Sequence, residues 1–181
     1  MSGTVEERMR RAVEAFAKDL GGYRTGRASA SLVEHITVDH YGAKTPLNQM
    51  AGISVPENTL LVVQPWDPSA IPAIEKALNN AQLGMTPAVD GNIIRLRVPS
   101  MTEDRRKELV KQMGKRTEEA RIEVRNVRRD EQEAIKKLEK SKEIGEDDAR
   151  RRLDALQKAT DAKIAEIERA AAAKEREVLE G

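Results

Sequence analysis

Four arginine side chains are concentrated in one short stretch of the chain, and their type and spacing favour binding to phosphate. They are Arg121, Arg125, Arg128 and Arg129. At 3.6 residues per turn, this spacing places the guanidinium groups roughly on one face of a helix, within about two turns. A guanidinium group is planar, permanently charged and able to donate paired hydrogen bonds to a phosphate. The stretch is a candidate surface for a nucleic-acid backbone, although many charge-rich helices simply face solvent.

The net charge of the whole chain hides this cluster. Lys and Arg total 32 and Asp and Glu 31 in 181 residues, for a formal net charge of +1. Residues 102–145 carry 14 basic and 11 acidic side chains, whereas residues 28–101 carry 4 and 6. Local clusters matter more than net charge for attracting an anion. An anion-binding surface is therefore expected in the helical part of the chain.

Aromatic residues are too few to read unpaired bases. The chain has one Phe, two Tyr and one Trp, whereas proteins that bind single strands stack successive bases on aromatic side chains. The arginines are expected to contact the backbone of a folded RNA, and we expect no DNA partner. Trp66 is interpreted as a structural residue, with docking of a partner as the alternative.

Nothing in the sequence points to catalysis, to a metal site or to a cofactor. The chain has no cysteine, which excludes a thiol nucleophile and Cys-ligated zinc. His35 and His40 are expected on opposite faces of a strand, and the glycines lack the spacing of a nucleotide-binding loop. The N-terminal residues have no apolar signal core, and the run Leu60–Val63 is too short to cross a bilayer. We expect a cytoplasmic protein with no enzymatic activity and no membrane partner.

Hydrophobic periodicity predicts three long helices. Apolar residues recur every three or four positions in three segments, residues 5–23, 103–144 and 146–180. Ser100 or Thr102 is the expected N-cap of the second helix, and Gly145 is expected to close it. The apolar stripe of that helix is predicted to be Leu109, Met113, Ala120, Val124, Val127, Ala134 and Leu138.

The region between the first two helices has a different texture. Short β-type runs occur at His35–His40, Thr59–Gln64 and Ile93–Val98, separated by Gly and Pro. A short amphipathic helix is expected from about Ile71, introduced by Asp67-Pro68-Ser69. This region therefore predicts a small α+β domain.

Each long helix has one apolar stripe and cannot bury it alone. The simplest α+β arrangement is an elongated antiparallel three-helix bundle, residues 1–28 and 102–181, with an inserted small β/α/β domain, residues 29–101. Two chain crossings would join the parts, and such a double linker permits hinge motion. The alternative is a coiled-coil adaptor or scaffold without RNA binding, in which the stripes form an oligomer.

Several motifs resemble ribosome recycling factor and keep the order and spacing of that family over nearly the whole chain. They are Arg24–Ser29, Tyr41-Gly42, Thr45–Leu47, Thr102-Glu103 with Arg105-Arg106, Val124–Asp130, and Lys142–Ile144 with Glu146–Asp148. The resemblance implies the family's architecture, a three-helix bundle with an inserted β/α/β domain in an overall L shape.

The resemblance also implies a translation factor that binds the bacterial ribosome after the finished chain is released. With elongation factor G and GTP hydrolysis, such factors split the subunits and free the messenger RNA and deacylated transfer RNA. In the family, arginines of the middle helix contact large-subunit ribosomal RNA. The resemblance implies that the RNA-binding residues are, in order, Arg128, Arg125, Arg129 and Arg106, together with Arg121. We call Arg121, Arg125, Arg128 and Arg129 the arginine row. The hinge would comprise Arg24, Thr25, Gly26, Arg27, Ala28 and Ser29. The expected partners of this monomer are the ribosome and elongation factor G.

Overall fold

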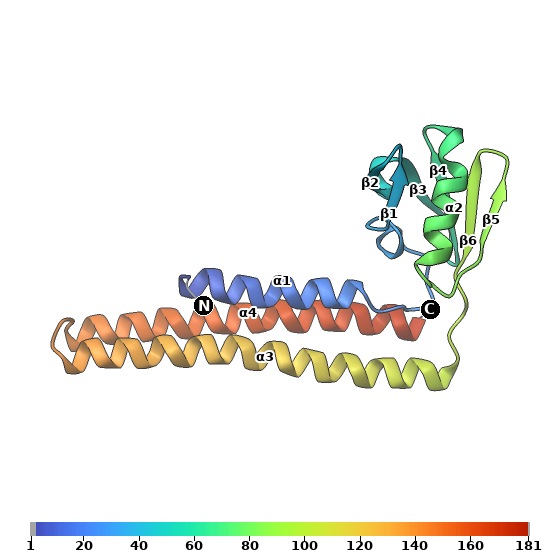
Figure 1. Ribbon diagram of the computed structural model, residues 1–181. Coiled ribbons are helices and arrows are strands. Elements are labelled where there is room, and N and C mark those ends of the chain that lie inside the picture. The colour runs from blue at the N-terminus through green and yellow to red at the C-terminus, as the bar shows by residue number, and fades with distance from the viewer. Residues whose placement is uncertain (1–2, 181) are drawn as a thin grey trace. The chain divides into compact units, whose positions relative to one another are not determined.

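A computed structural model describes residues 3–180 of the chain (Figure 1). The chain divides into two compact units. The helical unit contains the chain up to Tyr23 together with Lys107–Arg176, and the mixed unit contains Arg24–Arg106 together with the chain from Glu177. Within the described residues, no helix is both long enough and apolar enough to cross a membrane.

Three helices that pack together supply the helical unit, which confirms the expected α+β class with long packed helices. They are α1 (Val5–Gly21), α3 (Glu103–Lys140) and α4 (Glu146–Glu180). Helix α1 runs antiparallel to α3, because Arg8 pairs with Asp130 while Asp19, near the other end of α1, pairs with Arg116. Figure 1 shows α3 and α4 as an antiparallel pair that continues past the N-terminal end of α1.

The buried stripe of α3 follows the predicted period but differs at its C-terminal end. Its buried residues are Leu109, Met113, Thr117, Ala120, Val124, Val127 and Ile135. The predicted Ala134 is exposed and Leu138 is only half-buried, whereas Ile135 is buried. Apolar residues spaced by alternating threes and fours do not stay on the same side of a helix over ten turns, because the helix has 3.6 residues per turn. Which of two adjacent residues is buried at the far end therefore depends on the partner helix.

The helix ends are set by side-chain caps and by one residue with a positive φ. Thr102 caps α3, because its Oγ accepts a hydrogen bond from the backbone N of Arg105 at 3.2 Å. Helix α3 ends at Lys140, earlier than predicted, and Lys142 has a φ of 63°. The backbone N of Glu143 donates to the carbonyl of Leu138, as in a Schellman motif. Lys142 therefore closes the helix instead of Gly145.

Within residues 24–180, the mixed unit contains six strands, of which three were predicted from the sequence. The strands are β1 (Thr37–His40), β2 (Ala43–Pro46), β3 (Ala51–Glu57), β4 (Leu60–Pro65), β5 (Pro87–Asp90) and β6 (Ile93–Arg97). β1 and β2 form a hairpin, and the other four form an antiparallel sheet in the order β3-β4-β6-β5. β3 and β5 lie at its edges, where Pro and Gly are tolerated, and these residues had masked both strands in the sequence.

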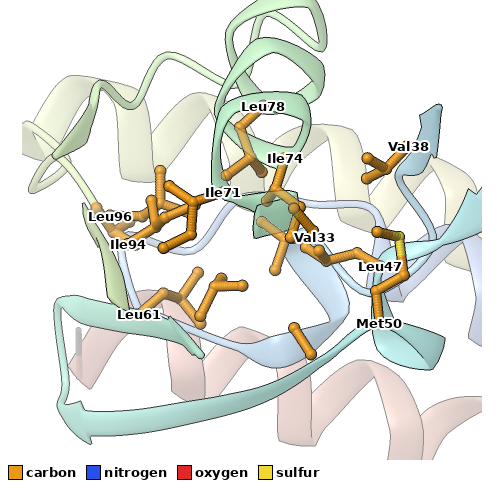
Figure 2. Packing of buried hydrophobic residues seen from close by; sticks show 14 residues of the cluster. Val33, Val38, Leu47, Met50, Leu61, Ile71, Ile74, Leu78, Ile94 and Leu96 are labelled. Atoms are coloured by element: carbon orange, nitrogen blue, oxygen red, sulfur yellow. The ribbon is translucent and has the colours of Figure 1, made fainter. Parts of the chain in front are cut away.

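The core of the mixed unit lies between the sheet and α2 (Ile71–Asn80). Figure 2 shows Ile71, Ile74 and Leu78 of α2 among the side chains of this core, which also includes Leu61 and Leu96. The buried cluster consists of aliphatic side chains and Met50. Trp66 was interpreted as a structural residue, but it does not belong to this core. Its side chain is 70% exposed.

Candidate nucleic-acid interface

The four clustered arginines all lie on α3, but the structure separates them into two pairs by their ionic partners. Arg121 Nη1 lies 2.9 Å from Glu118 Oε2, and its Nε lies 3.4 Å from Glu168 Oε1 on α4. Arg125 Nη1 lies 3.6 Å from the other oxygen of Glu118. These two arginines are thus partly neutralised by carboxylates of their own unit, and Arg121 also links α3 to α4.

Arg128 and Arg129 form the second pair. Within residues 3–180, neither has a carboxylate at ion-pair distance or a hydrogen-bond partner. Arg129 is exposed and Arg128 is half-buried, with its Nε buried and without a hydrogen-bond acceptor. Because their charge is not compensated by an ion pair, these two guanidinium groups are the best placed of the four to receive an anion.

Arg128 borders a hollow of about 260 Å³ between α3 and α4. The other lining residues are Gln132 of α3 and Leu153, Asp154, Leu156 and Gln157 of α4. Two amide side chains beside a guanidinium group offer neutral hydrogen-bond donors and acceptors, and Asp154 adds an acceptor. Because the carboxylate of Asp154 repels a phosphate, the hollow fits a sugar hydroxyl better than a phosphate or an apolar ligand.

One acidic residue of α3, Asp130, is paired with α1. Arg8 Nη2 donates a hydrogen bond to Asp130 Oδ2 at 2.8 Å, across the interface between α1 and α3. Asp130 directly follows Arg128 and Arg129 in the chain, yet its carboxylate is engaged by the neighbouring helix. This ion pair offsets the negative charge of Asp130.

A second ionic contact fixes the other end of α1 to α3. Arg116 Nε donates to Asp19 Oδ2 at 2.7 Å, and its guanidinium carbon lies 5.6 Å from the centroid of the buried Phe16 ring. Burial alone would lower the pKa of Arg116, but the hydrogen bond to Asp19 and the charge of Glu123 raise it. Arg116 therefore stays charged and has a structural role, although its residue type is the same as that of the row.

Arg106 does not join the row. It is half-buried near the start of α3, about six turns before Arg128. It belongs to the mixed unit, whereas Arg121, Arg125, Arg128 and Arg129 belong to the helical unit. Its assignment as an RNA contact stays a prediction that rests on the family motif.

The residues of the predicted hinge make defined contacts inside the mixed unit. Arg24 Nη2 donates to the carbonyl of Gln82 at 3.4 Å, and the backbone N of Ala28 donates to the carbonyl of Asn58 at 2.6 Å. Ser29 Oγ accepts from the N of Ser31 and so caps a 3-10 turn.

The middle of the same segment is tightly placed. Gly26 has a φ of +79°, and a Cβ there would stand 3.2 Å from Met101 Cγ. Thr25 is buried, and Arg27 is half-buried. Whether this segment acts as a hinge stays a prediction.

Several residues of the interface were not predicted from the sequence. Glu118 precedes Arg121 by one helical turn and Arg125 by two, so its spacing alone could have identified it. Glu168 and Gln157 come from α4, and Arg8 comes from α1. Their contacts depend on helix register, for which a single sequence carries no signal.

Comparison with known proteins identifies the chain. The family model for ribosome recycling factor matches residues 16–179. The chain belongs to the ribosome recycling factor family.

Relatives extend this match over nearly the full length. The ribosome-recycling factor of Syntrophomonas wolfei is 52% identical over 97% of this chain and 95% of its own length. That of Rhodopseudomonas palustris is 54% identical over 97% of this chain and 94% of its own length. The family assignment therefore concerns the whole chain and not one unit of it.

Two solved structures agree with the fold. A solution structure of the ribosome recycling factor has a TM-score of 0.81 and 47% identity, over 98% of this chain and 94% of that one. A second structure describes the T. thermophilus ribosome recycling factor with E. coli elongation factor G, bound to the E. coli post-termination complex. Its recycling factor has a TM-score of 0.69 and 40% identity, over 97% of this chain and 95% of that one.

Proposed function

We propose that this protein binds the ribosome after termination and, with elongation factor G and GTP hydrolysis, splits the subunits. The messenger RNA and deacylated transfer RNA are freed in the process. Membership of the ribosome recycling factor family supports this role. A related factor occurs together with elongation factor G on a post-termination complex, which supports the same two partners for this chain.

We place the principal ribosomal RNA contact at Arg128 and Arg129. The observation that carries this assignment is the absence of an ionic partner for either side chain among the described residues. A phosphate that meets these groups forms charge-assisted hydrogen bonds without first displacing a carboxylate. Arg125 contributes after it exchanges Glu118 for phosphate, and Arg121 contributes least, because two carboxylates already hold it.

The factor contributes binding and positioning, and the nucleotide-hydrolysing partner contributes the force. The glycines of the chain do not have the spacing of a phosphate-binding loop. We therefore assign hydrolysis to elongation factor G. Movement between the helical and mixed units, about the linker that includes residues 24–29, would convert docking of the partner into strain on the subunit contacts.

A polysome-breakdown assay tests this function. The protein is expected to convert polysomes with empty A sites to free subunits only when elongation factor G and GTP are both present. Breakdown that is independent of elongation factor G, or no breakdown at all, would contradict the proposal.

A salt titration of ribosome binding tests the site. Arg128→Ala is expected to reduce the slope of log affinity against log salt by roughly 0.7–0.9, the value for one lost phosphate contact. Arg10→Ala is the matched control, because it removes an equal charge from an exposed arginine of α1. Equal slopes for Arg128→Ala and the parent would show that Arg128 does not contact a phosphate of the ribosome.

A further inference from the structure

The hollow between α3 and α4 has both apolar and polar lining residues. Two of them are leucines of α4, of which Leu156 is buried and Leu153 is half-buried, and the others are polar. The volume of about 260 Å³ lies just below the range of about 300–1,000 Å³ that is usual for small-molecule pockets. The hollow therefore suits a single sugar ring better than a whole nucleotide.

The polar lining residues come from two helices. Gln132 follows Arg128 by four positions on α3, and Asp154 and Gln157 are three positions apart on α4, so each pair shares one helix face. Within residues 3–180, the side chains of Gln132 and Asp154 have no hydrogen-bond or ion-pair partner. Their full hydrogen-bonding capacity is thus available to a ligand.

The side chain of Gln157 is held in place by its own helix. Its Nε2 donates a hydrogen bond to Asp161 Oδ1 at 2.8 Å, which leaves Oε1 as an acceptor. The hollow therefore offers two acceptors, the Asp154 carboxylate and Gln157 Oε1, and one donor, the amide of Gln132. A hydroxyl group can donate and accept at once, whereas a phosphate only accepts and is repelled by Asp154.

The position of Arg128 connects this hollow to the proposed phosphate contact. Arg128 borders the hollow, and because its Nε is buried, only its terminal nitrogens can meet a ligand. The minor groove of an RNA helix displays 2′-hydroxyl groups, and proteins recognise such helices by contacts to the 2′-hydroxyl and the phosphate together. A guanidinium group beside hydroxyl-binding side chains matches that pair of groups.

We propose that the hollow binds the ribose of a ribosomal RNA nucleotide. The 2′-hydroxyl donates to the carboxylate of Asp154 and accepts from the amide of Gln132, while Arg128 binds a neighbouring phosphate. Gln157 supplies the second acceptor. This inference rests on the proposed function, because it names the chemical group that α4 recognises at the same interface. It makes Asp154 a binding residue although its charge is the same as that of the RNA backbone.

Substitution of Asp154 gives a result whose direction tests the proposal. If Asp154 acted only through its charge, Asp154→Ala would strengthen binding to RNA. The proposal instead predicts that Asp154→Ala weakens ribosome binding by about fivefold to tenfold, as for one lost hydrogen bond. Asp154→Asn keeps an acceptor oxygen and should stay within about twofold of the parent. An Ala variant that binds as tightly as the parent, or an Asn variant that loses as much as Ala, would overturn the proposal.

The salt dependence and a matched variant complete this test. Asp154→Ala removes no phosphate contact, so the slope of log affinity against log salt should equal that of the parent, in contrast to Arg128→Ala. Glu133→Ala is the control, because it removes an equal charge from an exposed residue of α3 that does not line the hollow. It should bind at least as tightly as the parent.

Analogue interference identifies the ribose directly. Large subunits are reconstituted with large-subunit RNA that carries randomly placed 2′-deoxy phosphorothioate nucleotides, and the subunits that the tagged protein retains are mapped by iodine cleavage. Ribose phosphorothioates control for the sulfur atom. The parent is expected to exclude the 2′-deoxy nucleotide from at least one position, and Asp154→Ala should no longer exclude it there. No such position, or the same exclusion by the parent and Asp154→Ala, would overturn the proposal.

The outcomes separate this inference from the proposed function. If the parent neither binds ribosomes nor breaks down polysomes, the proposed function fails. If the parent is active and Arg128→Ala reduces the salt slope, but Asp154→Ala binds like the parent, the ribose site alone is refuted.

Discussion

Arg8 Nη2 and Asp130 Oδ2 are 2.8 Å apart and join α1 to α3. Asp130 is the carboxylate next in the chain after Arg128 and Arg129. Its charge is matched by a residue from the opposite end of the sequence. Helix α1 thus offsets a negative charge that follows the two arginines in the sequence of α3.

Replacing Arg8 by Ala is expected to weaken ribosome binding while the protein stays folded. The change leaves Asp130 uncompensated and lowers the positive potential around the arginine row. The pair is partly exposed, so its loss should reduce stability by no more than about 1 kcal/mol. Cosedimentation with ribosomes at low salt measures the affinity. The Arg8→Ala/Asp130→Asn double variant removes both charges and should recover most of it; no recovery would mean that Arg8 acts on binding by another route.

Arg121→Ala and Arg128→Ala are expected to have opposite profiles. Arg121 bridges Glu118 and Glu168 of two helices, so its removal should lower the melting temperature with a smaller effect on ribosome affinity. Arg128 has no such partners, so its removal should lower affinity and leave the melting temperature nearly unchanged. Thermal denaturation and cosedimentation on the same preparations compare the two. A larger affinity loss for Arg121→Ala would reverse the proposed order of contacts.

Gly26→Ala is expected to destabilise the mixed unit by about 1 kcal/mol, because a non-glycine residue at positive φ is strained. The new Cβ would also meet Met101 Cγ at 3.2 Å. Urea unfolding of the full chain gives the free energy of unfolding. Gly52→Ala is the matched control, since a Cβ there meets nothing within 4 Å and needs no positive φ. Equal stability of the two variants would show that residue 26 changes its backbone conformation freely.

The N-terminus of α4 is expected to lose stability in acid through Asp148. A hydrogen bond from Arg151 and the charge of Arg152 lower the pKa of this carboxyl below its ordinary value of 3.8. A carboxyl whose pKa is lower in the folded protein stabilises the fold above its unfolded pKa, and this contribution disappears as the pH falls through the folded pKa. The melting temperatures of the parent and of Asp148→Asn should therefore differ at neutral pH and converge below about pH 4. A constant difference down to pH 2 would assign the effect to another group.

Sequence periodicity was sufficient to predict the three long helices and the arginine row, because both depend on local spacing along one helix. It could not show which arginines are already neutralised. Glu168 meets Arg121, and Arg8 meets Asp130, only after helices distant in sequence pack in a particular register.

The mixed unit shows the same limit for strands. β4 and β6 were predicted, because their alternating or continuous apolar residues face the core. β3 and β5 contain Gly or Pro and were not predicted. These residues are tolerated because both strands lie at the edges of the sheet, and the strand order cannot be read from one sequence. The C-terminal end of α3 was misplaced because Lys142, a residue without a turn signature, adopts the positive φ.

The exposure of Trp66 has an optical consequence. It is the only tryptophan of the chain and lies outside both the helical unit and the aliphatic core of the mixed unit. Its emission is therefore that of a water-exposed indole in the free protein. Unfolding of the helices would leave the signal almost unchanged, whereas a partner that covers the ring would shift it to shorter wavelength. Trp66 fluorescence should therefore report on binding of a partner that covers the ring and change little when the helices unfold.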